Sequence, residues 1–302
     1  MLGYFGPAGT FTHQALRTVS DDEAIAFASV REALDAVRSG EIRGAVVPIE
    51  NSVEGGVSAT LDELIAGAPL QIRREIVIPV EFGLYTRVPM ATSEVRSVLT
   101  HGHAAAQCRN WLVDNLPEAH VTEAGSTAGA AAEVADPESR YDAAVCARVA
   151  GELYGLHEVA YQIEDNAGAV TRFVEVGPAG PVPPQTGADK TTLVAFMRQD
   201  HAGALLEILE QFAVRGVNLT RIESRPTKTA LGSYSFSIDC EGHLFDRRVA
   251  EALQGLHRVC PQVFFLGSYP RANQRRPDIG VGFSDQEFDA AATWLKGLSR
   301  GR

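Results

Sequence analysis

Short apolar runs alternate with amphipathic stretches along the chain from its start to about Val176. Runs of about four to eight apolar residues are typical of buried strands, and apolar residues at helical spacing are typical of helices packed on a sheet. Because helical patterns separate most of the runs, the sequence predicts an α/β fold with a largely parallel sheet. The predicted strands are Met1–Phe5, Ala24–Ala28, Ala45–Ile49, Ile76–Val80, Val98–Thr100, His120–Glu123, Ala143–Ala147 and Val159–Ile163.

Residues that begin and end helices mark several boundaries. The pattern predicts a helix over Val30–Ser39 that ends at Gly40. A second helix is expected to begin at the capping residue Ser58, with acidic residues in its first turn. A third helix is predicted over His13–Val19, and Thr12 caps it if the segment before it is only a tight turn between strand and helix.

The sharpest change in composition is segment 177–187, where repeated prolines prevent helix and remove backbone donors, so we expect a linker there. The pattern after it is strand, helix, two strands, helix and strand, which is the βαββαβ or ferredoxin-like arrangement. After about Ala272, a basic stretch precedes one short amphipathic helix, Asp285–Leu298. The elements predicted for the βαββαβ module are Thr192–Met197, Ala204–Val214, Leu219–Ser224, Tyr234–Cys240, Arg247–Leu256 and Val263–Ser268.

Composition narrows the class of protein. The chain has 302 residues, 45% hydrophobic and 22% charged, which is typical of a soluble globular protein of about two domains. A formal net charge of −11 offers no basic surface to a phosphate backbone, so no nucleic acid partner is expected. The four cysteines are widely spaced and are interpreted as buried structural thiols. No stretch of about 18 consecutive apolar residues occurs in the sequence, and no basic leader precedes the first strand. We therefore expect no membrane partner and predict a location in the cytoplasm.

A glycine-rich turn follows the first strand, over Gly3–Thr12. Backbone N–H groups in such a turn can bind an anion, and a tight turn between strand and helix is the equally weighted alternative. The glycines are three residues apart with a proline among them, which differs from the G-x-G-x-x-G spacing of dinucleotide-binding proteins. We therefore expect no nucleotide cofactor.

Three polar residues, Glu50, Asn51 and Ser52, directly follow a predicted buried strand. The carboxyl ends of strands are where α/β sheets place ligands. Glu50 is a candidate proton donor or charge partner, Asn51 can both donate and accept, and Ser52 can cap a helix or bind a ligand. The alternative is a solvated loop.

Two other segments carry polar groups. His101 and His103 stand two residues apart ahead of Gln107, but no third ligand lies near in sequence, so a loop and helix cap is favoured over a metal site. Ser126 and Thr127 are expected as hydroxyl donors at the start of a helix.

The triplet Thr171-Arg172-Phe173 begins another strand. An arginine between an alcohol and an aromatic ring can hold a carboxylate beside a polarising hydroxyl. The alternative is a half-buried strand in which Arg172 pairs with a surface acid. In the C-terminal module, small residues near Gly203 and polar groups near Asn218 are suited to an amino acid at an interface between two modules, or else only shape turns of a plain core.

Together these residues resemble the prephenate dehydratase family with a C-terminal regulatory module of the ACT family. The resemblance spans about Met1 to Tyr269, and its markers in order are segments 6–12, 48–52, 171–173 and 223–226. Two positions depart from the family's pattern. His101-Gly102-His103 stands where His-Pro-Gln is usual, and Ala169 stands where an Asn is common, with Asn166 three residues earlier.

The resemblance implies two α/β lobes, similar to type II periplasmic binding proteins, with the substrate in the cleft between them. The first lobe would comprise residues 1–79 and 164–178, and the second residues 80–163. A linker (179–189), a ferredoxin-like ACT module (190–271) and a tail (272–302) would follow.

The family's reaction removes CO₂ and hydroxide from prephenate to give phenylpyruvate in L-phenylalanine biosynthesis. Aromatisation drives it, so the resemblance implies no cofactor and no metal. By the same resemblance, Thr171 donates to the leaving hydroxyl, with Glu50 as the alternative acid, and Arg172 balances the substrate's charge. The substrate-binding residues it implies are Thr10, Thr12, Asn51, Ser52, Gln107, Ser126, Thr127 and Phe173.

The ACT-like module implies feedback control by L-phenylalanine, bound between paired modules of a homodimer or homotetramer. Two other functions stay open: the same chemistry on an aminated substrate, as in arogenate dehydratase, and a non-catalytic two-lobed sensor of small molecules. Turnover separates the sensor from the enzymes, and substrate preference separates the two enzymes. The effector-binding residues implied are Gly203, Ala204, Leu205, Asn218, Leu219, Glu223 and Ser224.

Overall fold

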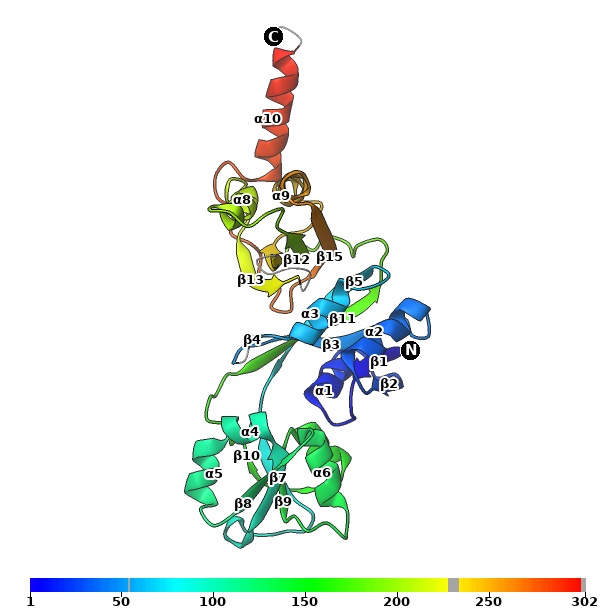
Figure 1. The fold of residues 1–302 in the computed structure, drawn as a ribbon, viewed down its shortest axis with the longest axis vertical. Helices are drawn as coiled ribbons and strands as arrows, with labels where there is room; N and C mark the ends of the chain where they lie inside the picture. The colour runs from blue at the N-terminus through cyan, green and yellow to red at the C-terminus, as the bar shows by residue number, and fades with distance from the viewer. Residues whose placement is uncertain (54, 228–233, 300–302) are drawn as a thin grey trace. The chain divides into compact units, whose positions relative to one another are not determined.

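The computed structural model describes residues 1–53, 55–227 and 234–299 (Figure 1). Within these residues, β1 runs parallel to both β2 and β3, as the alternation of strands and helices predicts. The strand order is β2-β1-β3-β11-β5, and β4 pairs with β3. The strands of this N-terminal sheet are β1 (Leu2–Phe5), β2 (Ala24–Phe27), β3 (Gly44–Asn51), β4 (Gly55–Gly56), β5 (Leu70–Pro79) and β11 (Val170–Pro178).

The helices α1 (Phe11–Arg17), α2 (Val30–Ser39) and α3 (Ser58–Leu64) lie between the strands of this sheet along the chain. The bounds predicted for α2 are confirmed, and Gly40 ends it in the left-handed conformation with a φ of 78°. In α3, the acidic residues lie beyond the first turn, which corrects the prediction that they begin the helix.

The cap that the tight-turn alternative assigned to α1, Thr12, is wrong. Thr10 is the cap, because its side chain accepts a hydrogen bond from His13 N. Thr12 lies inside the helix and is buried. Both residues are threonines that precede an apolar stretch, so the sequence pattern could not tell which one starts the helix.

A second sheet has the strand order β10-β6-β9-β7-β8. Strand β7 is parallel to β8 and β9, but β6 is antiparallel to β9 and β10. The sheet is therefore mixed, and the prediction of a largely parallel sheet fails here because the short β6 was not recognised. Its strands are β6 (Gly83–Thr86), β7 (Ser97–His101), β8 (His120–Ala124), β9 (Ala143–Cys146) and β10 (His157–Tyr161). Its helices are η1 (Thr92–Glu94), α4 (Gly102–Gln107), α5 (Arg109–Asn115), α6 (Thr127–Ala135) and α7 (Arg148–Leu153).

Two chain segments connect these two sheets and lie side by side. Val80 N donates to Ala169 O at 2.8 Å, and Ile163 N donates to Phe82 O at 3.1 Å. Each sheet packs on apolar residues of its own, so this region is a two-lobed α/β domain. One core contains Leu2, Tyr4, Leu16, Ile76 and Ile78, and another contains Leu84, Val98, Cys108, Leu112 and Val145.

The C-terminal part confirms the predicted βαββαβ order. Its antiparallel sheet has the order β13-β14-β12-β15. The two helices of the module share a buried core with the strands, which includes Ile208, Phe212, Ile238, Val249 and Leu256. The elements are β12 (Asp189–Phe196), α8 (Ala204–Ala213), β13 (Leu219–Pro226), β14 (Tyr234–Glu241), α9 (Arg247–Val259) and β15 (Gln262–Pro270), followed by α10 (Asp285–Leu298).

Contacts divide the chain into two compact units. One comprises residues 1–60 and 76–174, and the other comprises residues 61–75 and 175–302. Helix α3 and strand β5 therefore each begin in one unit and end in the other. No helix in the described ranges has the length and hydropathy needed to cross a membrane.

A buried ion pair joins Glu75 of β5 to Lys190 of β12. Glu75 also accepts from Ala272 N at 2.8 Å. Both charged side chains are almost fully buried, so each compensates the charge of the other inside the protein. This pair links the middle of β5 to the C-terminal sheet.

We expect Lys190→Met to lower the free energy of unfolding by about 3–5 kcal/mol, because it leaves the Glu75 carboxylate buried without a cation. Urea unfolding measures the change. The double variant Lys190→Met/Glu75→Gln should recover most of the loss, because it removes both charges and keeps an acceptor for Ala272 N. A double variant as unstable as the single one would contradict this account.

Candidate active site

A cavity of about 350 Å³ lies in the two-lobed domain. Phe11 and Phe82 form part of its apolar wall, with their rings edge to face at 5.4 Å. The cavity brings together eight residues that the sequence predicts for the site, from α1, β3, α4, α6 and β11. They are Thr10, Thr12, Asn51, Gln107, Ser126, Thr127, Thr171 and Phe173.

Asn51 and Thr171 are hydrogen-bonded within this cavity. Asn51 Nδ2 donates to Thr171 Oγ1 at 2.9 Å, and Asn51 Oδ1 accepts from Val53 N at 2.8 Å. The second bond fixes the orientation of the amide, so the NH₂ group faces the threonine. Since Thr171 Oγ1 accepts from Asn51, its own hydrogen can be donated to a group inside the cavity.

Glu50 and Arg172 lie on the other side of their strands. Adjacent residues of a strand point to opposite faces, so the neighbours of Asn51 and Thr171 face away from the cavity. There Arg172 Nη1 and Glu50 Oε2 form an ion pair at 3.3 Å. The Arg172 side chain is 7% exposed and that of Glu50 is 36% exposed. Neither belongs to the cavity lining described above.

Ser52 also lies outside that lining and binds the backbone of β11. Its Oγ accepts from Val170 N at 2.9 Å, and its N donates to Val170 O at 2.9 Å. These two bonds fix the start of β11 against the end of β3. In this structure Ser52 therefore positions the residue that precedes Thr171.

Two backbone amides of the glycine-rich turn donate hydrogen bonds to other groups of the protein. Gly6 N donates to Phe27 O at 2.9 Å, and Gly9 N donates to His13 Nδ1 at 3.1 Å. Burial, together with the charge of Arg17, lowers the pKa of His13, so its ring is neutral near pH 7 and can accept from Gly9. These partners favour the tight-turn interpretation at Gly6 and Gly9 over an anion site.

His101 and His103 line the cavity, which the sequence did not predict. The expectation that this segment caps a helix is confirmed, because the His101 side chain accepts from His103 N at the start of α4. Their position four and six residues before Gln107, a predicted site residue, could have indicated that they line the same cavity. No group of three metal-ligating side chains occurs within the described residues.

Hydrogen bonds at the ends of helices hold two other predicted site residues, Ser126 and Gln107, in position. Ser126 Oγ caps α6 by accepting from Gly129 N at 2.9 Å. Gln107 O accepts from Asp165 N at 2.7 Å, which ties α4 to the segment that leads into β11. Asn166 takes part in a backbone bond, in which its carbonyl accepts from Ala169 N at 3.4 Å.

The residues expected to bind an effector lie in the C-terminal module. Gly203 precedes α8 with a φ of 94°, a conformation that favours glycine, and Ala204 and Leu205 start that helix. Asn218 and Leu219 lie where the chain enters β13, and Glu223 and Ser224 lie along it. Within one chain they form three short groups.

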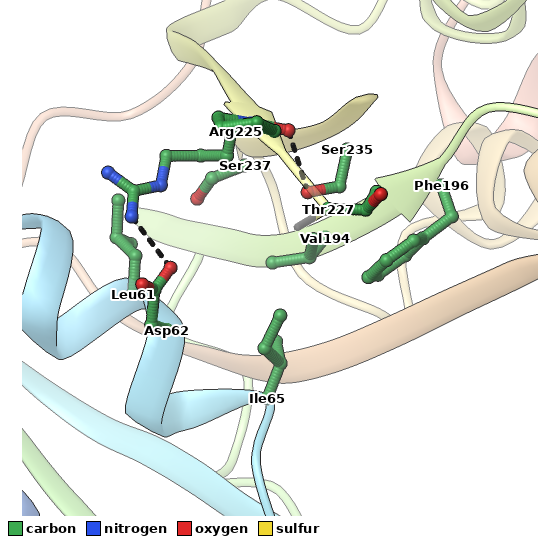
Figure 2. A pocket seen from close by; sticks show the side chains of 10 residues that line it. Leu61, Asp62, Ile65, Val194, Phe196, Arg225, Thr227, Ser235 and Ser237 are labelled. Carbon is green, nitrogen blue, oxygen red and sulfur yellow. Dashed lines mark hydrogen bonds and ion pairs between the residues drawn. The ribbon is translucent and has the colours of Figure 1, made fainter. Parts of the chain in front are cut away.

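A second cavity, of about 190 Å³, lies beside β12, β13 and β14 (Figure 2). Arg225 Nη2 donates to Asp62 Oδ1 at 2.7 Å on one side of it. Arg225 thus connects the strand that carries Glu223 and Ser224 to α3. The apolar residues around this cavity are Leu61, Ile65, Val194, Phe196 and Pro226.

Comparison with known proteins decides the family. The family model described as prephenate dehydratase matches residues 2–180. A prephenate dehydratase of Amycolatopsis methanolica is 46% identical over 303 residues, covering 99% of this chain and 98% of the relative. The chain belongs to the prephenate dehydratase family.

Solved structures agree. The crystal structure of the prephenate dehydratase of Arthrobacter aurescens in complex with L-Phe has a TM-score of 0.94 and 47% sequence identity, over 99% of both chains. A structure described as GqqA, a novel type of quorum quenching acylase, has a TM-score of 0.82 at 28% identity, over 91% of this chain and 99% of that one. Since fold alone does not fix a reaction, the assignment to prephenate dehydratase rests on the identity over the full length. The protein is an enzyme of the hydro-lyase class.

Cys108 directly follows Gln107 in this member of the prephenate dehydratase family. All four cysteines are free and buried, as predicted. Burial raises the pKa of Cys108 to about 12, and Glu164 and Asp165 act in the same direction. In an unfolded chain a thiol ionises near pH 8.5. The folded state therefore loses stability relative to the unfolded state as the pH rises from about 8.5 towards 12.

We expect Cys108→Ala to flatten the fall in unfolding free energy between pH 8 and pH 10 by about 2 kcal/mol, because the unfolded variant has one fewer thiol to ionise. The cavity that the substitution leaves lowers stability equally at each pH, so the slope isolates the thiol. Val98→Ala, in the same apolar core, is the matched control and should run parallel to the parent protein. Equal slopes for all three proteins would refute the raised pKa.

Proposed function

We propose that the cavity binds prephenate and that the Thr171 hydroxyl donates a hydrogen bond to the leaving hydroxyl of the ring. The observation that carries this proposal is the bond from Asn51 to Thr171, inside a cavity whose wall is partly aromatic. Because Thr171 Oγ1 accepts a hydrogen bond from Asn51, its hydroxyl hydrogen points away from Asn51 and is free to be donated to the substrate. Accepting a hydrogen bond also polarises its O–H group and makes it a better donor.

The reaction requires two bonds to break on one ring. The bond to the ring carboxylate breaks to release CO₂, and its electron pair completes the aromatic ring as the C–O bond to the hydroxyl breaks. The hydroxide that leaves becomes water when it gains a proton from solvent. A donor at that oxygen stabilises the developing charge, which is the role we assign to Thr171. Glu50 is disfavoured as the acid, because it faces Arg172 on the opposite side of the strand pair.

The neutral donors of the cavity would hold the substrate's two carboxylates. Thr10, Gln107 and Ser126 come from three different helices or their caps, so together they can fix the orientation of the ring. Arg172 is adjacent to Thr171 and buried, so its charge reaches the cavity through a poorly screened interior. Glu50 reduces that positive charge and at the same time holds Arg172 in place.

We expect Thr171→Val, which has nearly the same shape, to lower kcat by roughly 10²–10³-fold, because it removes one preorganised donor. Thr171→Ser should retain most of the turnover, since the hydroxyl remains. The measurement is phenylpyruvate formation from prephenate at neutral to mildly alkaline pH, with an enzyme-free control. A near-normal kcat in Thr171→Val would rule out Thr171 as the donor to the leaving hydroxyl and would leave Glu50 as the candidate for that role.

We further propose that the βαββαβ module is an ACT domain and that L-phenylalanine binds between two such modules in a homodimer or homotetramer. The Arthrobacter relative, 47% identical, crystallised in complex with L-Phe, which supports this effector. Gly203 leaves space for a ligand's backbone at the start of α8, since nothing lies within 4 Å of where its side chain would begin. The amide of Asn218 is a suitable partner for the amino and carboxylate groups.

Helix α3 offers a route from this module to the active site. At one end of α3, Thr60 Oγ1 donates to Pro48 O, two residues before Glu50. Two residues later, Asp62 accepts from Arg225, next to Ser224. A shift of β13 on effector binding would therefore act on α3 through Asp62, and on β3 through Thr60.

We expect Asn218→Ala to weaken L-phenylalanine binding, and Asp62→Asn to retain binding but lose inhibition. Coupling between two sites is worth about 5–150-fold in apparent affinity, and Asp62→Asn should bring that factor close to one. Calorimetry measures binding and prephenate turnover measures inhibition. Glu63→Gln, the same charge change one residue later, is the control and should respond as the parent protein does. Full inhibition of Asp62→Asn would refute the route through α3.

Two other functions remain candidates of lower rank, and the cytoplasm remains the proposed location. Arogenate differs from prephenate in carrying an amino group, and a comparison of kcat/KM on the two substrates decides between them. Tight binding without turnover of either substrate would favour the sensor instead.

A further inference from the structure

Helix α10 (Asp285–Leu298) is well formed but has no buried residue. It begins with a capping box, in which Ser284 Oγ accepts from Glu287 N and the Glu287 side chain accepts from Ser284 N. Its first turns are fastened to α9: Arg247 pairs with Asp289 at 2.8 Å, and Arg247 N donates to Asp285 Oδ1 at 2.8 Å. Figure 1 shows the rest of α10 extending from the βαββαβ module.

One side of this helix is apolar and exposed. On it, Leu295 is 62% exposed and Leu298 51%, and Ala291 and Ala292 are also exposed, whereas Phe288 is half-buried. An isolated helix of about 12–15 residues is marginal in water even with favourable composition. A 14-residue helix with an exposed apolar side therefore gains stability when a partner covers that side.

The sequence of α10 is suited to pairing with a second copy of the same helix. Phe288, Ala291, Ala292 and Leu295 lie at helical spacing on one face. The pattern is symmetric about the midpoint between the two alanines. If a second α10 lies antiparallel across that midpoint, Phe288 faces Leu295 and Ala291 faces Ala292. The two large residues at the ends and the small ones at the centre allow the helix axes to approach closely.

Charge favours the same arrangement. The first half of α10 carries Asp285, Glu287 and Asp289, whereas the second half carries Lys296 and no acidic residue. In an antiparallel pair, the acidic half of each helix lies beside the basic half of the other. A parallel pair would place like charges together. The helix dipoles also oppose each other favourably when antiparallel.

We propose that α10 is an association helix that pairs antiparallel with α10 of a second copy of this chain. The contact is two-fold symmetric, so each face is complementary to itself. A membrane surface is the less suitable partner, because the chain has a net charge of −11 and the flanks of the apolar face are mainly acidic.

Disulfide formation between differently tagged copies tests the pairing and its direction. The antiparallel geometry predicts that Phe288→Cys and Leu295→Cys proteins, mixed and oxidised, form the mixed disulfide. Phe288→Cys alone should not cross-link, because its two copies would lie about 10 Å apart along the axis, too far for a disulfide. The native cysteines do not interfere, since all four are buried.

The matched control uses the opposite face. Gln286 and Gly297 have the same symmetric relation as Phe288 and Leu295 but lie on the side away from the apolar stripe. A mixture of Gln286→Cys and Gly297→Cys should form little disulfide. Cross-linking by Phe288→Cys alone, or equal cross-linking by the control pair, would overturn the antiparallel pairing.

Sedimentation equilibrium on the full chain provides an independent test. Ala292→Asp puts a charge into the proposed interface, whereas Ala290→Asp puts the same charge on the opposite face of the same helix. We expect Ala292→Asp to weaken self-association at least about tenfold, and Ala290→Asp to leave it unchanged. Prephenate turnover, expected to be normal in both, verifies that the variants fold. Unchanged association in both, or equal weakening in both, would overturn the proposal.

Discussion

The alternation of side chains along two adjacent strands is the constraint on which this active site depends. Because β3 and β11 are neighbours, Asn51 and Thr171 meet on one face, and Glu50 and Arg172 meet on the other. The polar face is turned to the cavity and the charged face is not. The same backbone register therefore positions the hydroxyl and provides it with a charged pair behind it. A shift of either strand by one residue would exchange the two roles.

The two-lobed architecture adds the remainder of the site. The strand pair contributes one wall, while α4 and the start of α6 contribute donors from the second lobe. Two backbone bonds, from Val80 to Ala169 and from Ile163 to Phe82, hold the connecting segments together. Hinge closure around a ligand is a common motion of domains built from two lobes.

Sequence reasoning succeeded where a residue type carries a local mechanism. Gly40 ends α2 as its conformational freedom predicts, and the βαββαβ order followed from hydrophobic periodicity alone. It failed where neighbouring residues of the same type compete, as for Thr10 and Thr12, and where a strand is as short as Gly83–Thr86. The sequence alone also could not show which side chains of β3 and β11 face the cavity. Glu50 and Thr171 were candidates for one role, and the register that separates them is a property of two strands about 120 residues apart in sequence.

The linker marks a change in composition, but it does not mark where one folding unit ends. Residues 61–75 have their contacts with the C-terminal unit, including the buried pair of Glu75 and Lys190 and the close approach of Gly267 to the backbone of Ile72. A fragment cut at the linker would expose these groups to water with nothing to replace them. The second half of α3 and the first half of β5 therefore belong structurally to the C-terminal unit, although the chain reaches them more than 100 residues before the linker.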